Sequence, residues 1–166
     1  MKKKIFVVAA VIIGLASVAY AAFSQNLNIT GTGTTSADWN VKITGITQVA
    51  ATGATEGSAP TFTDTSATFN VTLAYPGASA TYDVAVLNGG TIPARLATIT
   101  GVTEANAATP AHITYELTGV AANASLAANG GTNTATVKVT WDPDSTVTGT
   151  ASKTATITLN YVQDTP

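Results

Sequence analysis

Apolar and polar side chains alternate along most of this chain with a period of two residues. The clearest run spans residues 69–75, and residues 82–86 repeat it. The same alternation recurs in five further segments, 23–30, 39–43, 113–117, 137–141 and 155–161. A period of two places successive side chains on opposite faces of a β-strand. No stretch after residue 22 has a convincing 3.6-residue apolar period, so the sequence predicts strands rather than helices.

Turn residues separate these segments. Examples are Tyr75-Pro76-Gly77, Asn88-Gly89-Gly90, Asn129-Gly130-Gly131 and Asp142-Pro143-Asp144. Gly and Asn accept a positive φ, and Pro fixes the first turn position. About eight short strands with regular turns predict an all-β fold, a jelly-roll-like β-sandwich.

Three local expectations follow from the same pattern. Residues 47–67 hold few large apolar side chains and are expected to form a long surface loop. The alanine-rich segment 120–128 is expected to form at most one helical turn. Trp39 and Trp141 fall at positions in the alternation that suit the core.

The first 21 residues have the three parts of a secretory signal peptide. Lys2, Lys3 and Lys4 precede an apolar run from Ile5 to about Ala19, and Ala19-Tyr20-Ala21 is a small-x-small exit. This pattern predicts cleavage by signal peptidase between Ala21 and Ala22, which makes residues 22–166 the mature domain. The expected location is secreted, extracellular or at the cell surface, with no membrane contact after processing. The alternatives are a retained membrane anchor and a type IV pilin that keeps its apolar segment.

Charge and cysteine usage narrow the classes of partner. The mature chain keeps four basic residues, Lys42, Arg95, Lys138 and Lys153, against nine acidic ones, for a net charge of −5. This balance disfavours nucleic-acid binding, which needs basic patches to neutralise phosphate. The chain has no cysteine, so stability has to come from packing, hydrogen bonds or assembly rather than from disulfides.

Few residues suit catalysis or metal binding. His112 is the only histidine, and with no cysteine it cannot complete a site of nitrogen and sulfur ligands. No Gly-x-Ser-x-Gly turn is present. We therefore expect a non-enzyme without a cofactor, and disfavour a secreted hydrolase. Residues 142–145 offer carboxylates for calcium, but an ordinary turn is favoured. The Asn-x-Ser/Thr sequons at Asn28, Asn70 and Asn123 are no more frequent than chance predicts.

The mature chain is expected to begin with an amphipathic strand. Residues 22–31 place Phe23, Leu27 and Ile29 on one face and polar side chains on the other. Such a strand can pair within its own domain, or it can be lent to the open edge of a neighbour. Lending between identical subunits is a head-to-tail contact, and a head-to-tail contact that does not close makes a filament.

Two stretches carry a resemblance to a known family. Residues 20–25, Tyr-Ala-Ala-Phe-Ser-Gln, follow the apolar run. Later, Pro76-Gly77 precedes the alternating strand 82–86, which Asn88-x-Gly90 ends. Together these stretches resemble the export signal and a core segment of the TasA/camelysin family. The resemblance covers the signal, the first strand and roughly residues 69–100.

The resemblance implies a jelly-roll subunit of biofilm matrix fibres or bundling pili, assembled by donor-strand exchange of the amino-terminal segment. The donor would be about residues 22–31, with Phe23, Leu27 and Ile29 in the acceptor groove. The chain has no His-Glu-x-x-His motif, so the protease label of camelysin does not carry over. We therefore expect a structural subunit that polymerises with identical copies. The alternative is a secreted monomeric β-sandwich that acts as a binding or adhesin module.

Overall fold

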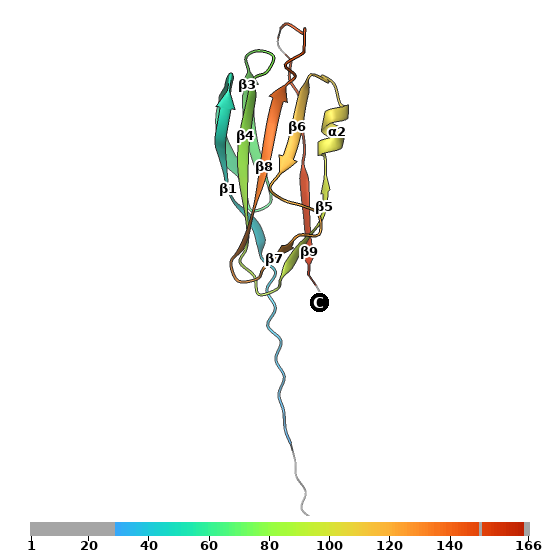
Figure 1. Ribbon diagram of the computed structural model, residues 1–166. Helices are drawn as coiled ribbons and strands as arrows, with labels where there is room; N and C mark the ends of the chain where they lie inside the picture. The colour runs from blue at the N-terminus through green and yellow to red at the C-terminus, as the bar shows by residue number, and fades with distance from the viewer. Residues whose placement is uncertain (1–28, 150, 165–166) are drawn as a thin grey trace, which may run out of the picture. The chain divides into compact units, whose positions relative to one another are not determined.

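The computed structural model describes residues 29–149 and 151–164, and the chain divides into two units, residues 1–35 and 36–166. The described part of the first unit, residues 29–35, has neither helix nor strand. The second unit contains nine strands in its described part (Figure 1). The strands are β1 (Val41–Thr52), β2 (Ala54–Phe62), β3 (Ala67–Leu73), β4 (Ser79–Asn88), β5 (Ala94–Thr100), β6 (Ile113–Thr118), β7 (Ser125–Leu126), β8 (Gly131–Trp141) and β9 (Thr158–Gln163).

The strands form three antiparallel sheets. The largest has the order β1-β4-β8-β6, and the other two have the orders β2-β3 and β7-β5-β9. Figure 1 shows the four-stranded sheet in front, with β2, β3 and β9 behind it. The prediction of an all-β fold is therefore confirmed.

Strict alternation in β4 shows why these residues form strands. Every second residue of β4, from Ala80 to Asn88, is buried, and the residues between them are half-buried. β4 pairs without a register shift with β8, whose inward residues from Ala135 to Trp141 are also buried. The two central strands thus bury one face each, as period-two patterning requires.

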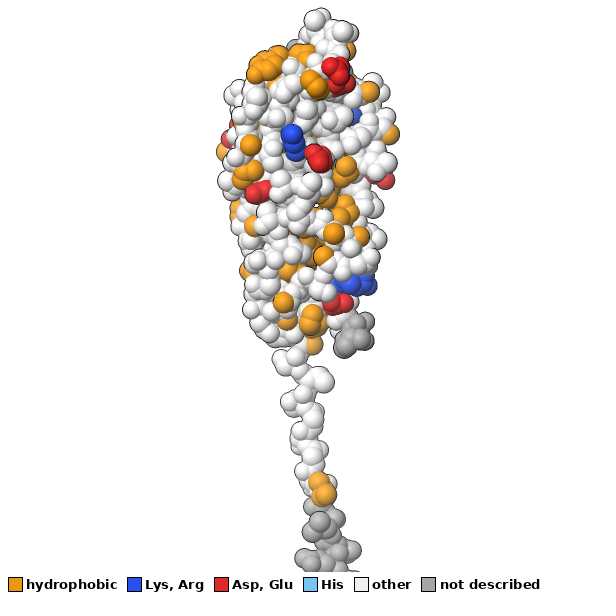
Figure 2. All heavy atoms as spheres, viewed as in Figure 1, with side chains coloured by type: hydrophobic (Ala, Val, Ile, Leu, Met, Phe, Trp, Pro, Cys, Tyr) orange, Lys and Arg blue, Asp and Glu red, His pale blue; other side chains and the backbone are white. Residues whose placement is uncertain are grey.

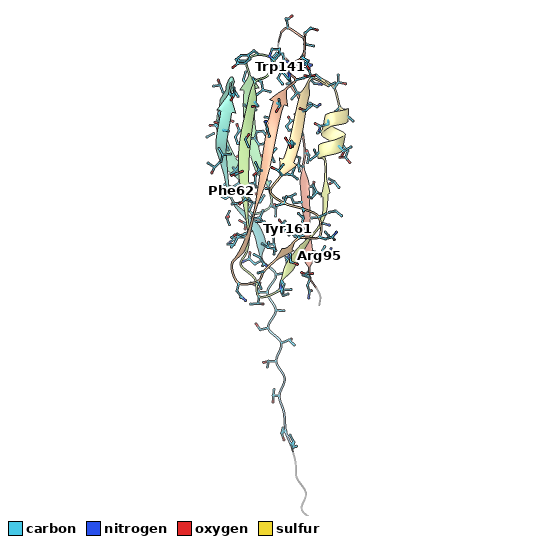
Figure 3. The ribbon with its side chains drawn as sticks, viewed as in Figure 1. Phe62, Arg95, Trp141 and Tyr161 are labelled. Carbon is cyan, nitrogen blue, oxygen red and sulfur yellow. The ribbon has the colours of Figure 1, made fainter. Side chains whose placement is uncertain are left out.

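The core lies between the four-stranded sheet and the sheets behind it. Tyr82 of β4 is fully buried, and its ring stacks on Phe69 of β3 with 4.2 Å between the ring centroids. Val137 and Val139 of β8 belong to the same cluster. A second cluster, toward the other end, joins Val86, Ala94 and Leu126. In Figure 3, Trp141 lies at the upper end of the domain, and Arg95 and Tyr161 lie toward the lower end.

The outer face of the four-stranded sheet carries little charge. Figure 2 shows this face mostly in the colour of uncharged polar side chains and backbone, with few charged groups. Threonines supply much of it, including Thr81 on β4, Thr114 on β6 and Thr134 on β8. Threonine suits an exposed strand because its branched Cβ fits the pleat while its hydroxyl stays hydrated.

Three sequence-based expectations are wrong. Residues 47–67 are not a loop, because the end of β1 and all of β2 lie there and pair with β4 and β3. Small and polar residues serve as strand residues here because the backbone ladder, not apolar alternation, defines the strands. The short helix α2 (Val102–Ala107) was not expected. Residues 120–128, which were expected to form at most one helical turn, form none.

The third error concerns one of the two tryptophans. Trp39 precedes β1 and its side chain is 44% exposed, whereas Trp141 is buried as expected. The alternating pattern of residues 39–43 begins two residues before the first residue of β1, Val41.

The predicted signal peptide and the Ala21–Ala22 cleavage site lie outside the described residues. In the part of the chain that is described, no helix has the length and apolar character needed to span a membrane.

Candidate strand-acceptor site

The layer behind the four-stranded sheet is interrupted. β2 adjoins β1 through the turn at Gly53, so the free edge of β3 points away from β1. On the other side, β9 is the last strand of the sheet β7-β5-β9, so its free edge points away from β5. Among the described residues no strand pairs with the outer edge of β3 or of β9, and apolar side chains of β3 and of residues 155–157 pack on the same core cluster. We call the junction between β3 and the chain leading into β9 the seam.

The segment that leads into β9 behaves as a strand without a partner. In residues 151–157, Lys153, Ala155 and Ile157 are half-buried and the residues between them are exposed. Ala155 and Ile157 pack against the core cluster of Tyr82, Val137 and Val139. No backbone N–H of this segment has a hydrogen-bond partner among the described residues. Strand patterning is thus present without the ladder that normally accompanies it.

The opposite side of the seam is the free edge of β3. Phe69, Val71 and Leu73 face the same core cluster as Ala155 and Ile157, and all of them remain only partly buried. β3 pairs with β2 along its other edge. Two unpaired edges, each with half-buried apolar side chains, therefore lie in one layer over one core. Unpaired strand edges of this kind are templates for pairing with another chain.

Side chains, rather than strand pairing, hold the 151–157 segment in place. The Tyr115 hydroxyl, from β6, donates to the carbonyl oxygen of Lys153 over 2.8 Å. The Lys153 Nζ donates to the carbonyl oxygens of Ile113 at 2.7 Å and Pro110 at 3.0 Å. Burial raises the pKa of the Tyr115 phenol and lowers the pKa of the Lys153 ammonium. These hydrogen bonds attach Lys153 to β6 and to Pro110, while the backbone N–H groups of residues 151–157 have no described partner.

Of the predicted donor residues, Ile29 alone is described. Its side chain is 90% exposed. Phe23 and Leu27 lie outside the described residues. The alternation in residues 22–31 predicts a donor strand, whereas no pattern in the sequence indicates the acceptor or the seam. The alternation at 155–161 predicted a strand there, but nothing in a sequence pattern reveals whether a strand edge has a partner.

The chain enters the second unit beside the loop that follows β4. The Asp38 N–H donates to the Thr91 Oγ1, and the Thr91 N–H donates to the Asp38 carbonyl oxygen. The Gly89 N–H donates to the Asn40 carbonyl oxygen over 2.8 Å. A Cβ on Gly90 would lie 2.4 Å from the Asp38 oxygen, so glycine is needed for this close approach. Residues 38–40 are thus fixed to the end of the domain that holds loop 88–91.

The remaining candidate residues occupy ordinary structural positions. His112 is half-buried next to Trp141, with 5.6 Å between the ring centroids, and its Nε2 and the Trp141 Nε1 have no described partner. The Asp142 carboxylate accepts from the Asp144 N–H within the turn. Among the described residues, no three His, Cys, Asp or Glu side chains are grouped to hold a metal ion.

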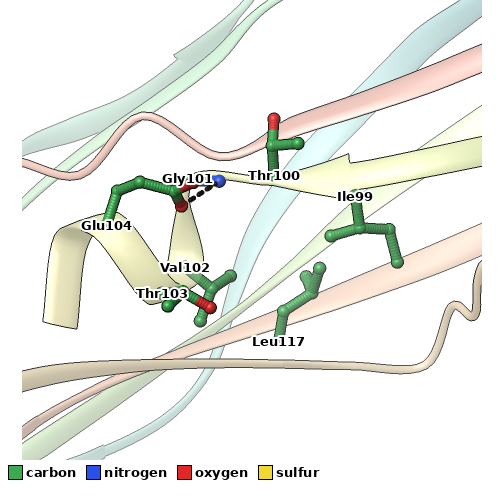
Figure 4. Close-up of a pocket in the computed structure, with 7 residues that line it drawn as sticks. All are labelled: Ile99, Thr100, Gly101, Val102, Thr103, Glu104 and Leu117. Carbon is green, nitrogen blue, oxygen red and sulfur yellow. Dashed lines mark hydrogen bonds between the residues drawn. The ribbon is translucent and has the colours of Figure 1, made fainter. Parts of the chain in front are cut away.

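A cavity of about 290 Å³ lies between the end of β5, the start of α2 and Leu117 of β6 (Figure 4). Ile99, Val102 and Leu117 give it an apolar lining. Glu104 is its one carboxylate, and that group accepts from the Gly101 N–H over 2.9 Å. The carboxylate thus caps the helix rather than facing a ligand.

Comparison with known proteins gives no relative. No protein-family model matches the chain, and neither a curated protein nor a solved structure matches it.

Proposed function

We propose that this protein is a structural subunit of an extracellular fibre, in which the amino-terminal strand of one copy inserts at the seam of the next. The observation that carries the proposal is the interrupted layer, with its two unpaired edges and half-buried apolar side chains. The resemblance to secreted fibre and pilus subunits points the same way. In this proposal the layered sheets are a jelly-roll-like sandwich and residues 1–21 direct export.

The proposed donor is long enough to cover the seam, and its apolar residues have the same period of two as those of the seam. Residues 22–31 extend over about 30 Å at roughly 3.3 Å per residue. β3 and the 151–157 segment are each seven residues long. The donor presents Phe23, Leu27 and Ile29 at period-two positions, and the seam presents apolar side chains beneath it.

The energetics favour a firm joint. Fully burying a large apolar side chain contributes about 1.5–3 kcal/mol, so three of them supply several kcal/mol before the cost of ordering the donor. Each added backbone hydrogen bond contributes about 0.5–1.5 kcal/mol net. The exposed side chain of Ile29 has most of its surface left to bury.

The proposal fixes the direction of the donor. Residues 38–40 attach at the end of the domain with loop 88–91, and a head-to-tail filament brings that end to the opposite end of the next subunit. The donor then enters the seam with residue 31 near the opening and Phe23 deepest. In that direction it runs parallel to β3 and antiparallel to residues 151–157.

Charge substitution on the two faces of the donor tests assembly. Leu27→Asp with Ile29→Asp should leave single subunits, because two carboxylates would have to be buried at the seam. The matched control is Asn26→Asp with Asn28→Asp, which adds the same charges to the polar face and should still polymerise. Light scattering and negative-stain microscopy of the mature protein give the readout. Equal polymerisation by both variants would contradict the proposal.

Cysteine pairs test the acceptor and the direction, because the natural chain has no cysteine. Ser24→Cys with Thr156→Cys, and Asn28→Cys with Ser152→Cys, should form intermolecular disulfides and give a ladder of linked subunits. The mismatched pair Ser24→Cys with Ser152→Cys should link poorly, since four residues of strand separate the partners by about 13 Å. Linkage within single chains would mean that the strand pairs in its own domain.

The alternative, a monomeric binding or adhesin module, has one observation in its favour. Trp39 is 44% exposed rather than in the core, and exposed aromatic side chains are typical of binding surfaces. This alternative predicts that the mature protein stays monomeric at high concentration and shows no filaments with or without seeds.

A further inference from the structure

The four-stranded sheet ends at β6, and this edge differs from the seam. β6 pairs with β8 on one side and, within residues 29–149 and 151–164, with no strand on the other. In an antiparallel ladder, alternate residues turn their N–H and C=O groups to opposite edges. Ile113, Tyr115 and Leu117 turn these groups outward, as the partners of Ile113 and Tyr115 show. Without those partners the edge would be a second place for a strand to add.

One side-chain amide takes the place of a neighbouring strand. The Asn106 Nδ2 donates to the Tyr115 carbonyl oxygen, and the Tyr115 N–H donates to the Asn106 Oδ1, each over 2.8 Å. A primary amide carries the same donor and acceptor types as a peptide group. Asn106 therefore makes the pair of bonds that a residue on an adjacent antiparallel strand would make.

The outward carbonyl group of Ile113 on β6 also has a hydrogen-bond partner. The Ile113 carbonyl oxygen accepts from the Lys153 Nζ over 2.7 Å. A charged donor makes a stronger hydrogen bond than a neutral one. The outward carbonyl groups of Ile113 and Tyr115 and the N–H of Tyr115 thus all have partners, while Leu117 lines the cavity of Figure 4.

The position of Asn106 is set by its short helix. Gly101 precedes α2 with a φ of 98°, and a Cβ there would lie within bonding distance of the Thr156 carbonyl oxygen. The Glu104 carboxylate caps the helix, and Ala105 is buried in the core. The helix is therefore fixed at both its start and its inner face, with Asn106 next to β6.

We propose that the Asn106 and Lys153 side chains close the β6 edge of the four-stranded sheet to the addition of a strand from another subunit. The closure itself is a property of the single subunit. Its consequence for assembly rests on the proposed function: a closed β6 edge prevents side-to-side association of two β6 strands, which would compete with insertion of the donor at the seam.

A cysteine reporter on β6 tests the closure in the full mature chain. If two β6 strands pair antiparallel through their outward groups, Tyr115 faces Leu117 and the two copies of Glu116 lie opposite each other. Glu116 is exposed on β6, so Glu116→Cys should report this pairing as a disulfide-linked dimer. With Asn106 and Lys153 intact, mild oxidation should give little dimer.

Removing the two blocking side chains should open the edge. Adding Asn106→Ala and Lys153→Met to the reporter should raise the yield of linked dimer about tenfold or more, an increase that corresponds to at least 1.4 kcal/mol. The matched control adds Asn160→Ala, which removes an exposed asparagine from β9, and should leave the yield unchanged. An equal yield from the blocked and opened chains would overturn the proposal.

Circular dichroism and microscopy separate loss of folding and loss of filaments from a change in dimer yield. Circular dichroism checks that each variant folds, and if the double substitution does not, Asn106→Asp replaces it. That variant keeps an acceptor for the Tyr115 N–H but loses the donor, so it should give an intermediate yield, and no rise would overturn the proposal. Filament formation is scored separately by microscopy. A protein that makes no filaments refutes the fibre function, while the dimer comparison still decides the closure of β6.

Discussion

The single residue Tyr115 links the four-stranded sheet to the segment that leads into β9. Its backbone bonds to Asn106, its ring is buried in the core, and its hydroxyl reaches the carbonyl oxygen of Lys153. One side chain therefore helps to support both the closed β6 edge and the 151–157 side of the seam.

The buried phenol predicts a loss of stability in alkali. Burial raises the pKa of Tyr115 above its ordinary value of about 10. The unfolded chain ionises first, so the contribution is complete below about pH 10 and is lost as pH rises through the raised pKa. Tyr82 acts in the same direction, since its pKa is raised chiefly by burial and further by Glu56.

Urea unfolding between pH 8 and pH 11.5 measures this effect. Tyr115→Phe should flatten the alkaline fall in the free energy of unfolding. At neutral pH the same change should cost about 0.5–1.5 kcal/mol, because the bond to Lys153 is lost. Tyr75→Phe, a change at an exposed phenol, is the control. An unaltered alkaline slope in Tyr115→Phe would exclude this residue as a cause.

At the scale of elements, the sequence predicted the strands well where apolar residues alternate. In residues 82–86 and 137–141 every second side chain is buried, as the pattern indicates. The prediction failed for β2, whose residues are mostly exposed and small, and for α2, which is too short to show a helical period. β2 is stabilised by its pairing with β3. The position of α2 is set by the Glu104 cap and by the close approach of Gly101 to Thr156. Neither kind of interaction produces an apolar pattern in the sequence.

Of the candidate site, the donor strand could be predicted from the sequence and the acceptor could not. An amphipathic donor strand can be recognised from local alternation, as at Phe23, Leu27 and Ile29. An acceptor depends on which strand edges lack partners, and that is a property of the assembled sheets. Residues 155–161 read as one strand in the sequence, although among the described residues only those from Thr158 onward pair with another strand.

Amide hydrogen exchange of residues 151–157 should show whether a donor strand pairs with them. The backbone N–H groups of residues 151–157 have no described partner, so they should exchange quickly in single subunits. In filaments the donor would bond to them, and their exchange should slow markedly. Mass spectrometry of the two states gives the comparison, with the central strand β8 as the internal control. Equally fast exchange of residues 151–157 in filaments would place the joint elsewhere.

At the scale of the whole molecule, the two tryptophans report on different events. Trp141 is buried at one end of the domain, and Trp39 is exposed beside residues fixed to loop 88–91 at the other. Because the proposed joint forms where the amino-terminal segment leaves the domain, Trp39 should become less accessible on assembly.

Quenching by acrylamide measures that change. In Trp141→Phe, Trp39 is the remaining tryptophan, and its quenching should fall when filaments form. In Trp39→Phe, the buried Trp141 should be quenched weakly before and after assembly. Unchanged quenching of Trp39 in filaments seen by microscopy would mean that the joint leaves this end of the domain exposed.

The attachment of residues 38–40 to loop 88–91 has a mechanical consequence. A pull on the amino-terminal segment enters the domain at these backbone bonds and passes into β1, which pairs with β4 along its length. The ladder bonds between β1 and β4 lie across the direction of such a force. They are therefore strained together in shear rather than opened one after another from an end. A chain of these domains would resist tension through its longest edge-to-centre pairing, without a single covalent cross-link.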